Sequence, residues 1–271
     1  MFKHFYFVEC TKKCIFAFHF GIENNMEGFI LAAGLGTRLR PLTNDRPKAL
    51  VEVESGEWRV ESGERRVENG ERRTLLEMAI HRLEEAGIGH IVVNVHHFGE
   101  KVIDFIGSHR WQARIDISDE RQQLLDTGGG LKKAAPLFSG KENVLVHNVD
   151  ILSEIDLRDV ERRHREEGNL VTLCVSQRVT KRLLRFDEKG HLAGRTDADD
   201  PCGLAFSGIS VVSPKLFPLL PEADHPYPII DEYIRLSAEG HGIGCYRHSA
   251  EHWLDVGKPE TLEKARLWMH S

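Results

Sequence analysis

The sequence lacks the features that mark three common classes of protein. No run of apolar residues approaches the ~18 that a membrane-spanning helix needs, so no membrane span is predicted. The five cysteines are odd in number and scattered, which predicts no disulfide framework and a reducing, cytoplasmic compartment. A net charge of −6 argues against a broad basic groove for nucleic acid. The 271 residues are nevertheless enough to bury a substantial core, and one α/β domain accounts for most of them.

A short apolar run followed by a glycine-rich loop begins near residue 29. Residues 29–33 (FILAA) are typical of a strand that is buried on both faces of a parallel sheet. Gly34 and Gly36 then remove the Cβ atoms that would keep a phosphate chain away from the backbone amides. Arg38 and Lys48 add positive charge to the same segment. The stretch is therefore a candidate phosphate-binding site.

The spacing of this loop excludes two other phosphate-binding motifs. A dinucleotide fingerprint needs a third glycine where this chain has Leu39, and a P-loop needs Gly-Lys-Ser/Thr four residues after the first glycine. Residues 34–43 (GLGTRLRPLT) and 47–50 (PKAL) instead resemble the signature of the sugar-1-phosphate nucleotidyltransferases, G-x-G-T-R-L-x-P-L-T followed by P-K-A-L. The resemblance implies a Rossmann-like, three-layer α/β fold of the nucleotide-diphospho-sugar transferase type, with a mixed, mostly parallel sheet, over residues 26–271.

Alternating strand and helix patterns along the rest of the chain predict the same fold class. Ligands in open α/β sheets bind at the carboxyl ends of the strands, so the residues that follow strands are the candidates for the site. The predicted strands lie at 29–33, 90–95, 115–117, 143–147, 170–175, 182–187, 191–194, 203–212, 243–246 and 253–257. The predicted helices lie at 74–87, 101–106, 126–138, 157–167 and 229–238, with a last one from 259.

Two segments lie outside this alternation. Residues 1–25 are rich in Phe but interrupted by Lys and Glu, and we interpret them as an N-terminal extension that is disordered or results from an upstream start site. Residues 53–73 contain a tandem heptad (VESGEWR, VESGERR, VENGERR), which offers one Val per repeat and not the two apolar positions of a coiled coil. We interpret the repeat as an expanded, charged surface loop with no catalytic part, and a regulatory or partner-binding role stays open.

Two acidic residues form the second candidate group. Asp150 and Asp255 each come at the end of a predicted strand, although they are far apart in the sequence. Mg²⁺ is usually held by one or two carboxylates together with substrate phosphates and water, so we expect both to bind one Mg²⁺ ion. The family carries these acids as G-D and as W-x-D-x-G. This chain has Val149 where most relatives have Gly, and residues 253–257 (WLDVG) match the second motif.

The resemblance also implies which residues bind the two substrates. The loop at 125–130 (LDTGGG) corresponds to the loop that lies over the nucleobase, and Gly208 in FSGIS allows a sugar ring to lie against the chain. The expected catalytic residues are Arg38, Lys48, Asp150 and Asp255. The nucleotide is expected to contact Leu31, Ala32, Ala33, Gly34, Gly36, Thr37, Arg38, Asp126, Thr127 and Gly128. The sugar or its phosphate is expected to contact Asn148, Gly208 and Arg182.

The activity that the resemblance implies is a Mg²⁺-dependent reaction of a nucleoside triphosphate with a sugar 1-phosphate, giving a nucleotide sugar and pyrophosphate. Within the family, LDTGGG, FSGIS and WLDVG favour UTP and N-acetylmuramate 1-phosphate, in the recycling of cell-wall (peptidoglycan) sugars. Mannose- or heptose-1-phosphate guanylyltransferases are the alternative, because base choice rests on a few hydrogen bonds.

Two hypotheses of other classes are weaker. A regulatory subunit that binds nucleotide sugar without catalysis would tend to lose the loop arginine, the lysine or one of the two metal-binding aspartates. This chain keeps all four residues, which are Arg38, Lys48, Asp150 and Asp255. A glycosyltransferase would need a D-x-D motif, of which residues 148–150 (NVD) carry half. The sequence indicates no oligomeric state.

Overall fold

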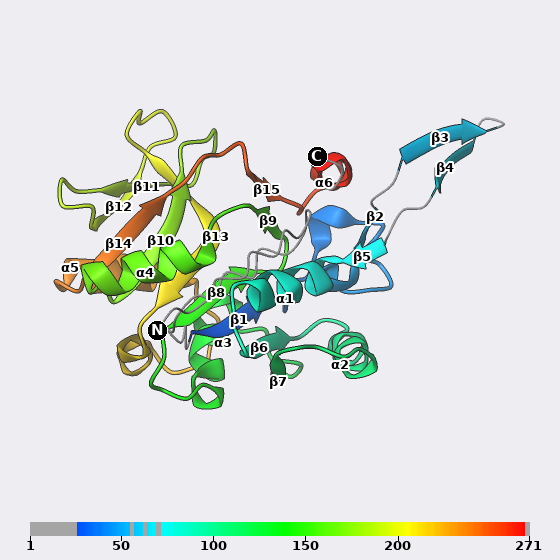
Figure 1. The fold of residues 1–271 in the computed structure, drawn as a ribbon. Helices are drawn as coiled ribbons and strands as arrows, with labels where there is room; N and C mark the ends of the chain where they lie inside the picture. The colour runs from blue at the N-terminus through cyan, green and yellow to red at the C-terminus, as the bar shows by residue number, and fades with distance from the viewer. Residues whose placement is uncertain (1–25, 55–56, 62–63, 69–71, 269–271) are drawn as a thin grey trace, which may run out of the picture.

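A nine-stranded mixed sheet forms the centre of the computed structural model, which describes residues 26–54, 57–61, 64–68 and 72–268. The strands follow the order β12-β11-β13-β8-β1-β6-β7, and β10 pairs with both β13 and β14 (Figure 1). The four strands β7, β6, β1 and β8 run parallel, and β13 joins β8 in the antiparallel direction. The strands are β1 (Glu27–Leu31), β6 (His90–Val95), β7 (Arg114–Asp119), β8 (Val144–Asn148), β10 (Val171–Ser176), β11 (Leu183–Phe186), β12 (Leu192–Thr196), β13 (Leu204–Val212) and β14 (Ile243–Arg247).

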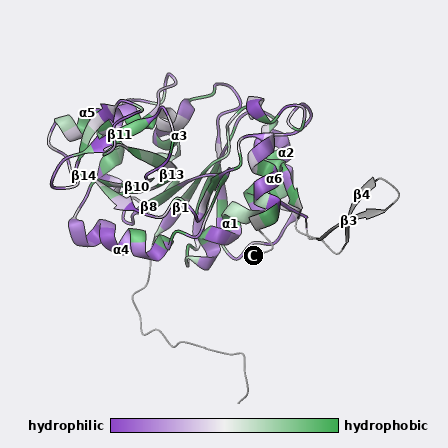
Figure 2. Ribbon diagram, turned by 90° about the horizontal axis from the view of Figure 1, so that it is seen from above, coloured by the Kyte–Doolittle hydropathy of each residue, from purple (hydrophilic) through white to green (hydrophobic). Residues whose placement is uncertain are grey.

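Helices cover both faces of the sheet and give the predicted three layers. In Figure 2, α3 and α5 lie on one side of the strands and α1 and α4 on the other. Apolar side chains of α1, α2, α4 and α6 join one buried cluster, whereas those of α3 and α5 join the other. The helices are α1 (Leu75–Glu85), α2 (Gly99–Ser108), α3 (Asp126–Ala134), α4 (Leu157–Glu167), α5 (Ile229–Ala238) and α6 (Pro259–Trp268), with short 3₁₀ helices η1 (Thr37–Leu39), η2 (Lys48–Leu50), η3 (Ala135–Leu137) and η4 (Pro214–Leu219). The predicted α/β fold class is confirmed.

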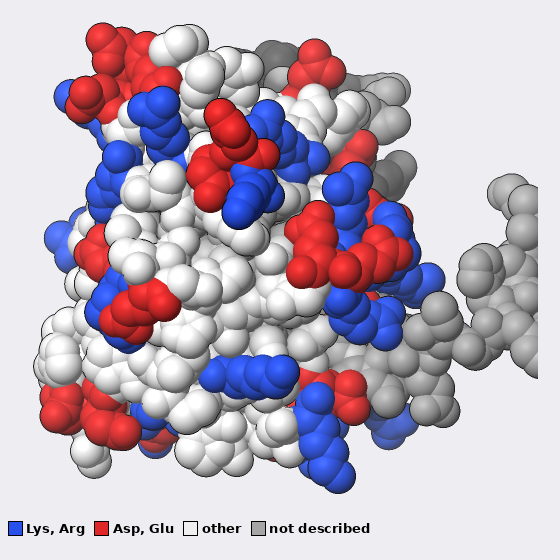
Figure 3. All heavy atoms as spheres, turned by 90° about the vertical axis from the view of Figure 1, so that its left-hand side faces the viewer, with Lys and Arg blue, Asp and Glu red and all other residues white. Residues whose placement is uncertain are grey.

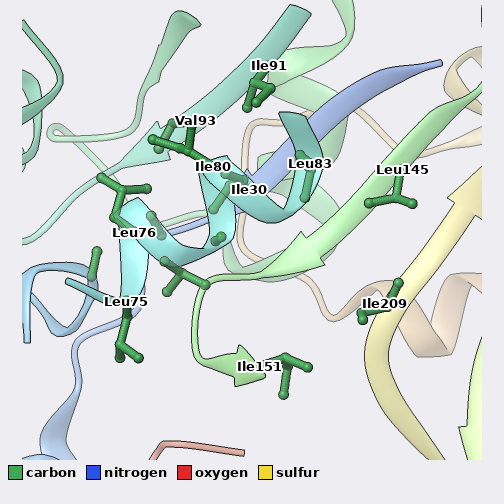
Figure 4. Close-up of a cluster of buried hydrophobic side chains, with 14 of the residues drawn as sticks. Ile30, Leu75, Leu76, Ile80, Leu83, Ile91, Val93, Leu145, Ile151 and Ile209 are labelled. Atoms are coloured by element: carbon green, nitrogen blue, oxygen red, sulfur yellow. The ribbon is translucent and has the colours of Figure 1, made fainter. Parts of the chain in front are cut away.

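Helix α1 shows how the sequence produces this packing. Thr74 caps its N-terminus in a capping box with Glu77, so two backbone amides that the helix cannot satisfy find side-chain partners. Leu76, Ile80 and Leu83 recur at helical spacing and are fully buried. Figure 4 shows these side chains between the helix and the strands. Each such side chain contributes about 1.5–3 kcal/mol by leaving water, which fixes α1 against the parallel half of the sheet.

The repeat segment departs from the loop that the sequence predicted. β2 (Glu52–Glu54) pairs antiparallel with β5 (Arg72–Thr74), and β3 (Glu57–Glu61) pairs antiparallel with β4 (Glu64–Glu68). Ser-Gly and Asn-Gly pairs separate short segments that each contain one Val, and such spacing of turn residues is compatible with a hairpin. The hairpin of β3 and β4 extends away from the rest of the molecule (Figure 1). The prediction of an N-terminal extension concerns residues 1–25, which lie outside the described residues.

A second, smaller pairing was also not predicted. β9 (Ile151–Ser153) directly follows the end of β8 and pairs antiparallel with β15 (Trp253–Asp255), with Ile151 opposite Asp255. The Val256 amide donates to the Asp150 carbonyl over 2.8 Å, which extends this ladder by one bond. The pairing brings a segment near the end of the chain to the carboxyl end of the central strand β8.

On the face drawn in Figure 3, at the side of α5, β11 and β12, basic and acidic side chains are intermixed around an uncharged area. This face carries no broad patch of one sign. Among the residues that the structure describes, no helix combines the length and the apolar character needed to cross a membrane.

Candidate active site

The glycine-rich loop between β1 and η1 is shaped to present its amides to a ligand. Gly36 has a φ of +63°, a left-handed conformation that favours glycine, and the Thr43 hydroxyl donates to its carbonyl over 2.8 Å. A Cβ on Gly34 would lie 3.9 Å from the Lys48 amine, so this amine lies against the loop. Within the described part of the chain, the amides of residues 34–38 donate to no protein acceptor. Such amides can bind phosphate oxygens.

Two of the expected nucleotide contacts are already used inside the protein. The amides of Ala32 and Ala33 both donate to Oδ1 of Asn94, over 2.7 and 3.1 Å. These two residues can therefore contact a nucleotide only through other atoms. The Leu31 carbonyl is likewise engaged, because it accepts the Val149 amide at 3.2 Å.

Asn94 belongs to a buried polar network that the sequence analysis missed. Its amide nitrogen donates to Glu120 Oε1 over 2.7 Å, and the other oxygen of Glu120 accepts the Leu125 amide at 3.1 Å. Burial raises the pKa of Glu120, whereas these two hydrogen bonds oppose the rise. The network connects the glycine-rich loop to the loop at 125–130. An asparagine within the apolar run IVVNV was the signal that could have identified it, because buried polar groups need partners.

The four residues expected to be catalytic come together at the carboxyl end of β8. The Lys48 amine lies 2.6 Å from Asp150 Oδ2, and both side chains are largely buried. Arg38 lies 3.8 Å from Asp255 Oδ2 at the open side of the group. Asp255 arrives on β15, opposite the residue that follows Asp150. Two positive and two negative groups thus occupy one site beside the free loop amides.

Burial and neighbouring charge act in opposite directions on the two carboxyls. Burial on its own would raise the pKa of Asp150, but the charge and the hydrogen bond of Lys48 outweigh it and hold this pKa below the usual value. The pKa of Asp255 is raised, by burial first and then by the neighbouring Asp150 carboxylate. A cation placed between the two carboxylates would relieve their repulsion.

The arrangement suits a hard cation that it shares with a substrate. Oδ1 of Asp255 is buried and has no hydrogen-bond partner. A Cβ on Gly257 would lie 2.6 Å from that same oxygen, so the glycine keeps the space beside it open. No cluster of three or more potential metal-binding side chains occurs in the described part of the chain. Two carboxylates completed by phosphate and water are a usual set of ligands for Mg²⁺.

Val149, the departure from the family motif, does not intrude on the site. Its side chain is 1% exposed and belongs to the apolar cluster on the α1 face of the sheet. The valine side chain, which glycine would lack, therefore packs in the core.

The loop at 125–130 uses its glycines for packing. A Cβ on Gly128 would lie 2.3 Å from the Tyr227 ring, and the Gly128 amide already donates to the Tyr227 carbonyl over 2.9 Å. The Thr127 hydroxyl accepts the Ile229 amide over 2.9 Å. Asp126 is exposed and has a φ of +58°, a conformation that is uncommon outside glycine and recurs at ligand sites. Of the three residues expected here, Asp126 is exposed, Thr127 is half-buried and Gly128 is buried.

On the sugar side, the structure brings two of the three expected residues together. Gly208 has a φ of +76°, and a Cβ on it would lie 2.9 Å from the side-chain nitrogen of Asn148. Arg182 is exposed directly before β11, and its side chain forms no hydrogen bond or ion pair with the other two. Arg178, which the sequence did not single out, lies instead beside β13, the strand of Gly208, because it donates over 2.9 Å to the Ser207 hydroxyl.

Comparison with known proteins places the chain in a family. The model of the nucleotidyl transferase family matches residues 27–270, so the chain belongs to that family. It is 32% identical over 260 residues to an N-acetylmuramate alpha-1-phosphate uridylyltransferase of Caulobacter vibrioides, covering 88% of this chain and 95% of the relative. A Neisseria meningitidis protein of the same name is 26% identical over 253 residues, covering 89% and 97%. A structure of HddC from Yersinia pseudotuberculosis, complexed with GMP-PN, has the same fold, with a TM-score of 0.70, 21% identity and coverage of 90% and 99%.

Proposed function

We propose that the protein transfers the UMP group of UTP to N-acetylmuramate 1-phosphate and releases pyrophosphate. The observation that carries the reaction type is the meeting of Lys48, Asp150, Asp255 and Arg38 beside loop amides that have no protein acceptor. Similarity over nearly the whole length to two N-acetylmuramate alpha-1-phosphate uridylyltransferases supports the choice of substrates. We take residues 26–271 as one catalytic domain and place it in the cytoplasm.

The chain's own groups suit an in-line displacement at the α-phosphorus. An oxygen of the sugar 1-phosphate forms the new bond, and the bond from the α-phosphorus to the pyrophosphate oxygen breaks, with its electron pair leaving on pyrophosphate. The amides of residues 34–38 and Arg38 bind the leaving pyrophosphate. Lys48 neutralises charge where the two substrates' phosphates meet. Such a reaction depends on positioning and electrostatics, and it needs no protein nucleophile.

We further propose that Asp150 and Asp255 hold Mg²⁺. When bound, the ion neutralises phosphate charge and orients the phosphates for the displacement. Lys48, which pairs with Asp150 over 2.6 Å, is close enough to contribute to the same phosphates. The unpartnered buried oxygen of Asp255 supports this assignment.

The test is pyrophosphate release by the purified protein with Mg²⁺, crossing UTP, GTP, dTTP and CTP with a panel of sugar 1-phosphates. We expect turnover with UTP and N-acetylmuramate 1-phosphate, and its loss in Asp150→Ala and Lys48→Ala. Turnover confined to GTP with mannose or heptose 1-phosphate would contradict the proposed substrates but support the proposed type of reaction. Nucleotide binding by folded protein without turnover of any pair would contradict the reaction and favour a regulatory subunit.

A further inference from the structure

Arg178 is a partly buried cation without a carboxylate partner. Within the described part of the chain, no acidic side chain lies within ion-pair distance of it, and Asp255 acts on it only over a longer range. Burial lowers the pKa of Arg178 to about 10, because the surrounding protein disfavours its charge. Buried charges are usually paired, so an unpaired one next to a candidate site indicates that a ligand supplies the partner.

The orientation of this side chain is fixed from several sides. Nη1 donates to the hydroxyls of Ser176 and Ser207 over 2.8 and 2.9 Å, and Nη2 donates to the Phe206 carbonyl. The guanidinium carbon lies 3.7 Å from the centre of the Trp253 ring, so one face of the group is stacked. The guanidinium is therefore held before any ligand binds.

The Ser207 hydroxyl is itself held by a neighbour. It lies 2.7 Å from Nε2 of His248, whose other ring nitrogen lies 2.7 Å from the Ser249 carbonyl. Because Arg178 can only donate, the Ser207 hydroxyl accepts from it. Burial lowers the pKa of His248, which favours the neutral ring. In that ring Nδ1–H donates to the Ser249 carbonyl, and Nε2 accepts the hydrogen bond of the Ser207 hydroxyl. This chain of hydrogen bonds orients the arginine.

A count of donors shows what remains for a ligand. A guanidinium has five N–H groups, and the contacts above use three of them. The Nε–H and one N–H of Nη2 are left without an acceptor in the described part of the chain. Although Nε has no acceptor, it is not fully buried, so a ligand can reach it. Two donors on one planar group match the two oxygens of a carboxylate or phosphate.

The position of the group defines which substrate it faces. Its partners Phe206 and Ser207 immediately precede Gly208, and Trp253 lies two residues before Asp255 on β15. Arg178 thus lies between the expected sugar-binding residues and the carboxylates. Given the proposed function, we propose that Arg178 binds an acidic group of the sugar 1-phosphate through its two free N–H groups, either a carboxylate on the sugar or the 1-phosphate.

Binding measurements separate these two sources of negative charge. Isothermal titration would use N-acetylmuramate 1-phosphate, which carries both groups, N-acetylglucosamine 1-phosphate, which carries only the phosphate, and N-acetylmuramate, which carries only the carboxylate. In Arg178→Gln we expect affinity for N-acetylmuramate 1-phosphate to fall about 10- to 100-fold, the effect of losing charge-assisted hydrogen bonds. An equal loss for N-acetylglucosamine 1-phosphate assigns Arg178 to the phosphate. A loss confined to the two N-acetylmuramate compounds assigns it to the carboxylate.

Further variants separate recognition from folding. Arg178→Lys keeps the charge but loses the planar fork, and we expect it to recover part of the affinity while keeping the melting temperature of the parent. Arg163→Gln, on the exposed face of α4, removes an arginine of an unrelated ion pair and should leave all three affinities unchanged. Unchanged affinity of folded Arg178→Gln for every compound would overturn the inference. Turnover by the parent enzyme, measured alongside, is the separate test of the proposed function, so either can fail alone.

Discussion

The pair of Lys48 and Asp150 allows the electrostatics of the site to be tested apart from its chemistry. At 2.6 Å and an effective dielectric constant of about 20, the attraction is about 6 kcal/mol before the desolvation of both groups is subtracted. Removing one partner of such a buried pair leaves the other charge uncompensated and costs about 3–5 kcal/mol. We therefore expect Lys48→Met to lower the free energy of unfolding by about 3 kcal/mol. The double variant with Asp150→Asn should recover at least 2 kcal/mol relative to the sum of the single changes.

The assay is urea unfolding of the parent, the two single variants and the double variant, with pyrophosphate release measured on each. Stability should return in the double variant, whereas activity should be lost in all three, because the reaction needs both charges. The exposed pair of Arg162 and Glu166 on α4, 2.7 Å apart, provides a control cycle whose coupling should stay below about 0.5 kcal/mol. Additive effects of the Lys48 and Asp150 substitutions to within about 0.5 kcal/mol would refute the reasoning.

Three further predictions concern residues around this pair. Gly208→Ala should cost about 1–2 kcal/mol in urea unfolding and raise KM for the sugar 1-phosphate, because its φ is +76° and its Cβ would lie 2.9 Å from Asn148; an unchanged KM would contradict the placement of the sugar there. Asn94→Leu should destabilise the protein by at least about 3 kcal/mol, since two amides and the Glu120 carboxyl lose their partner; a loss below 1 kcal/mol in the same assay would contradict this network. Burial lowers the pKa of His147 to about 4. The contribution of neutral His147 to stability is therefore complete above the unfolded pKa of about 6.5, and the free energy of unfolding falls by up to about 3 kcal/mol as the pH falls toward 4. His147→Gln should flatten the dependence of the free energy of unfolding on pH over that range.

The parts of the site that the sequence predicted are those where local chemistry leaves few options. A strand followed by two glycines, an arginine and a lysine at fixed offsets predicts a phosphate-binding loop from local chemistry alone. The structure places Lys48 and Gly34 against each other, as this pattern requires. Strand and helix positions were predicted by the same local rules, with ends that shift by a few residues.

Contacts between segments that are distant in the sequence could not be predicted from local patterns. The glycines at 128–130 belong to a loop that the resemblance places over the nucleobase, yet their missing Cβ atoms make room for Tyr227, for the His225 carbonyl and for Glu120. Nothing in the local sequence shows which neighbour will fill that space. Arg178 could not be singled out from the sequence for the same reason, because only the packing of β10, β13 and β15 shows that this arginine is enclosed.

The pairing of β9 with β15 explains why two aspartates from distant parts of the chain can act together. Asp150 is fixed by the end of β8, a central strand whose position is set by β1 and β13 on either side. Asp255 has no such strand of the main sheet beneath it. Its position depends on three paired residues of β15 and on the bond from the Val256 amide to the Asp150 carbonyl. Because this last bond joins the backbones next to both carboxylates, the separation of the two residues is set by main-chain geometry.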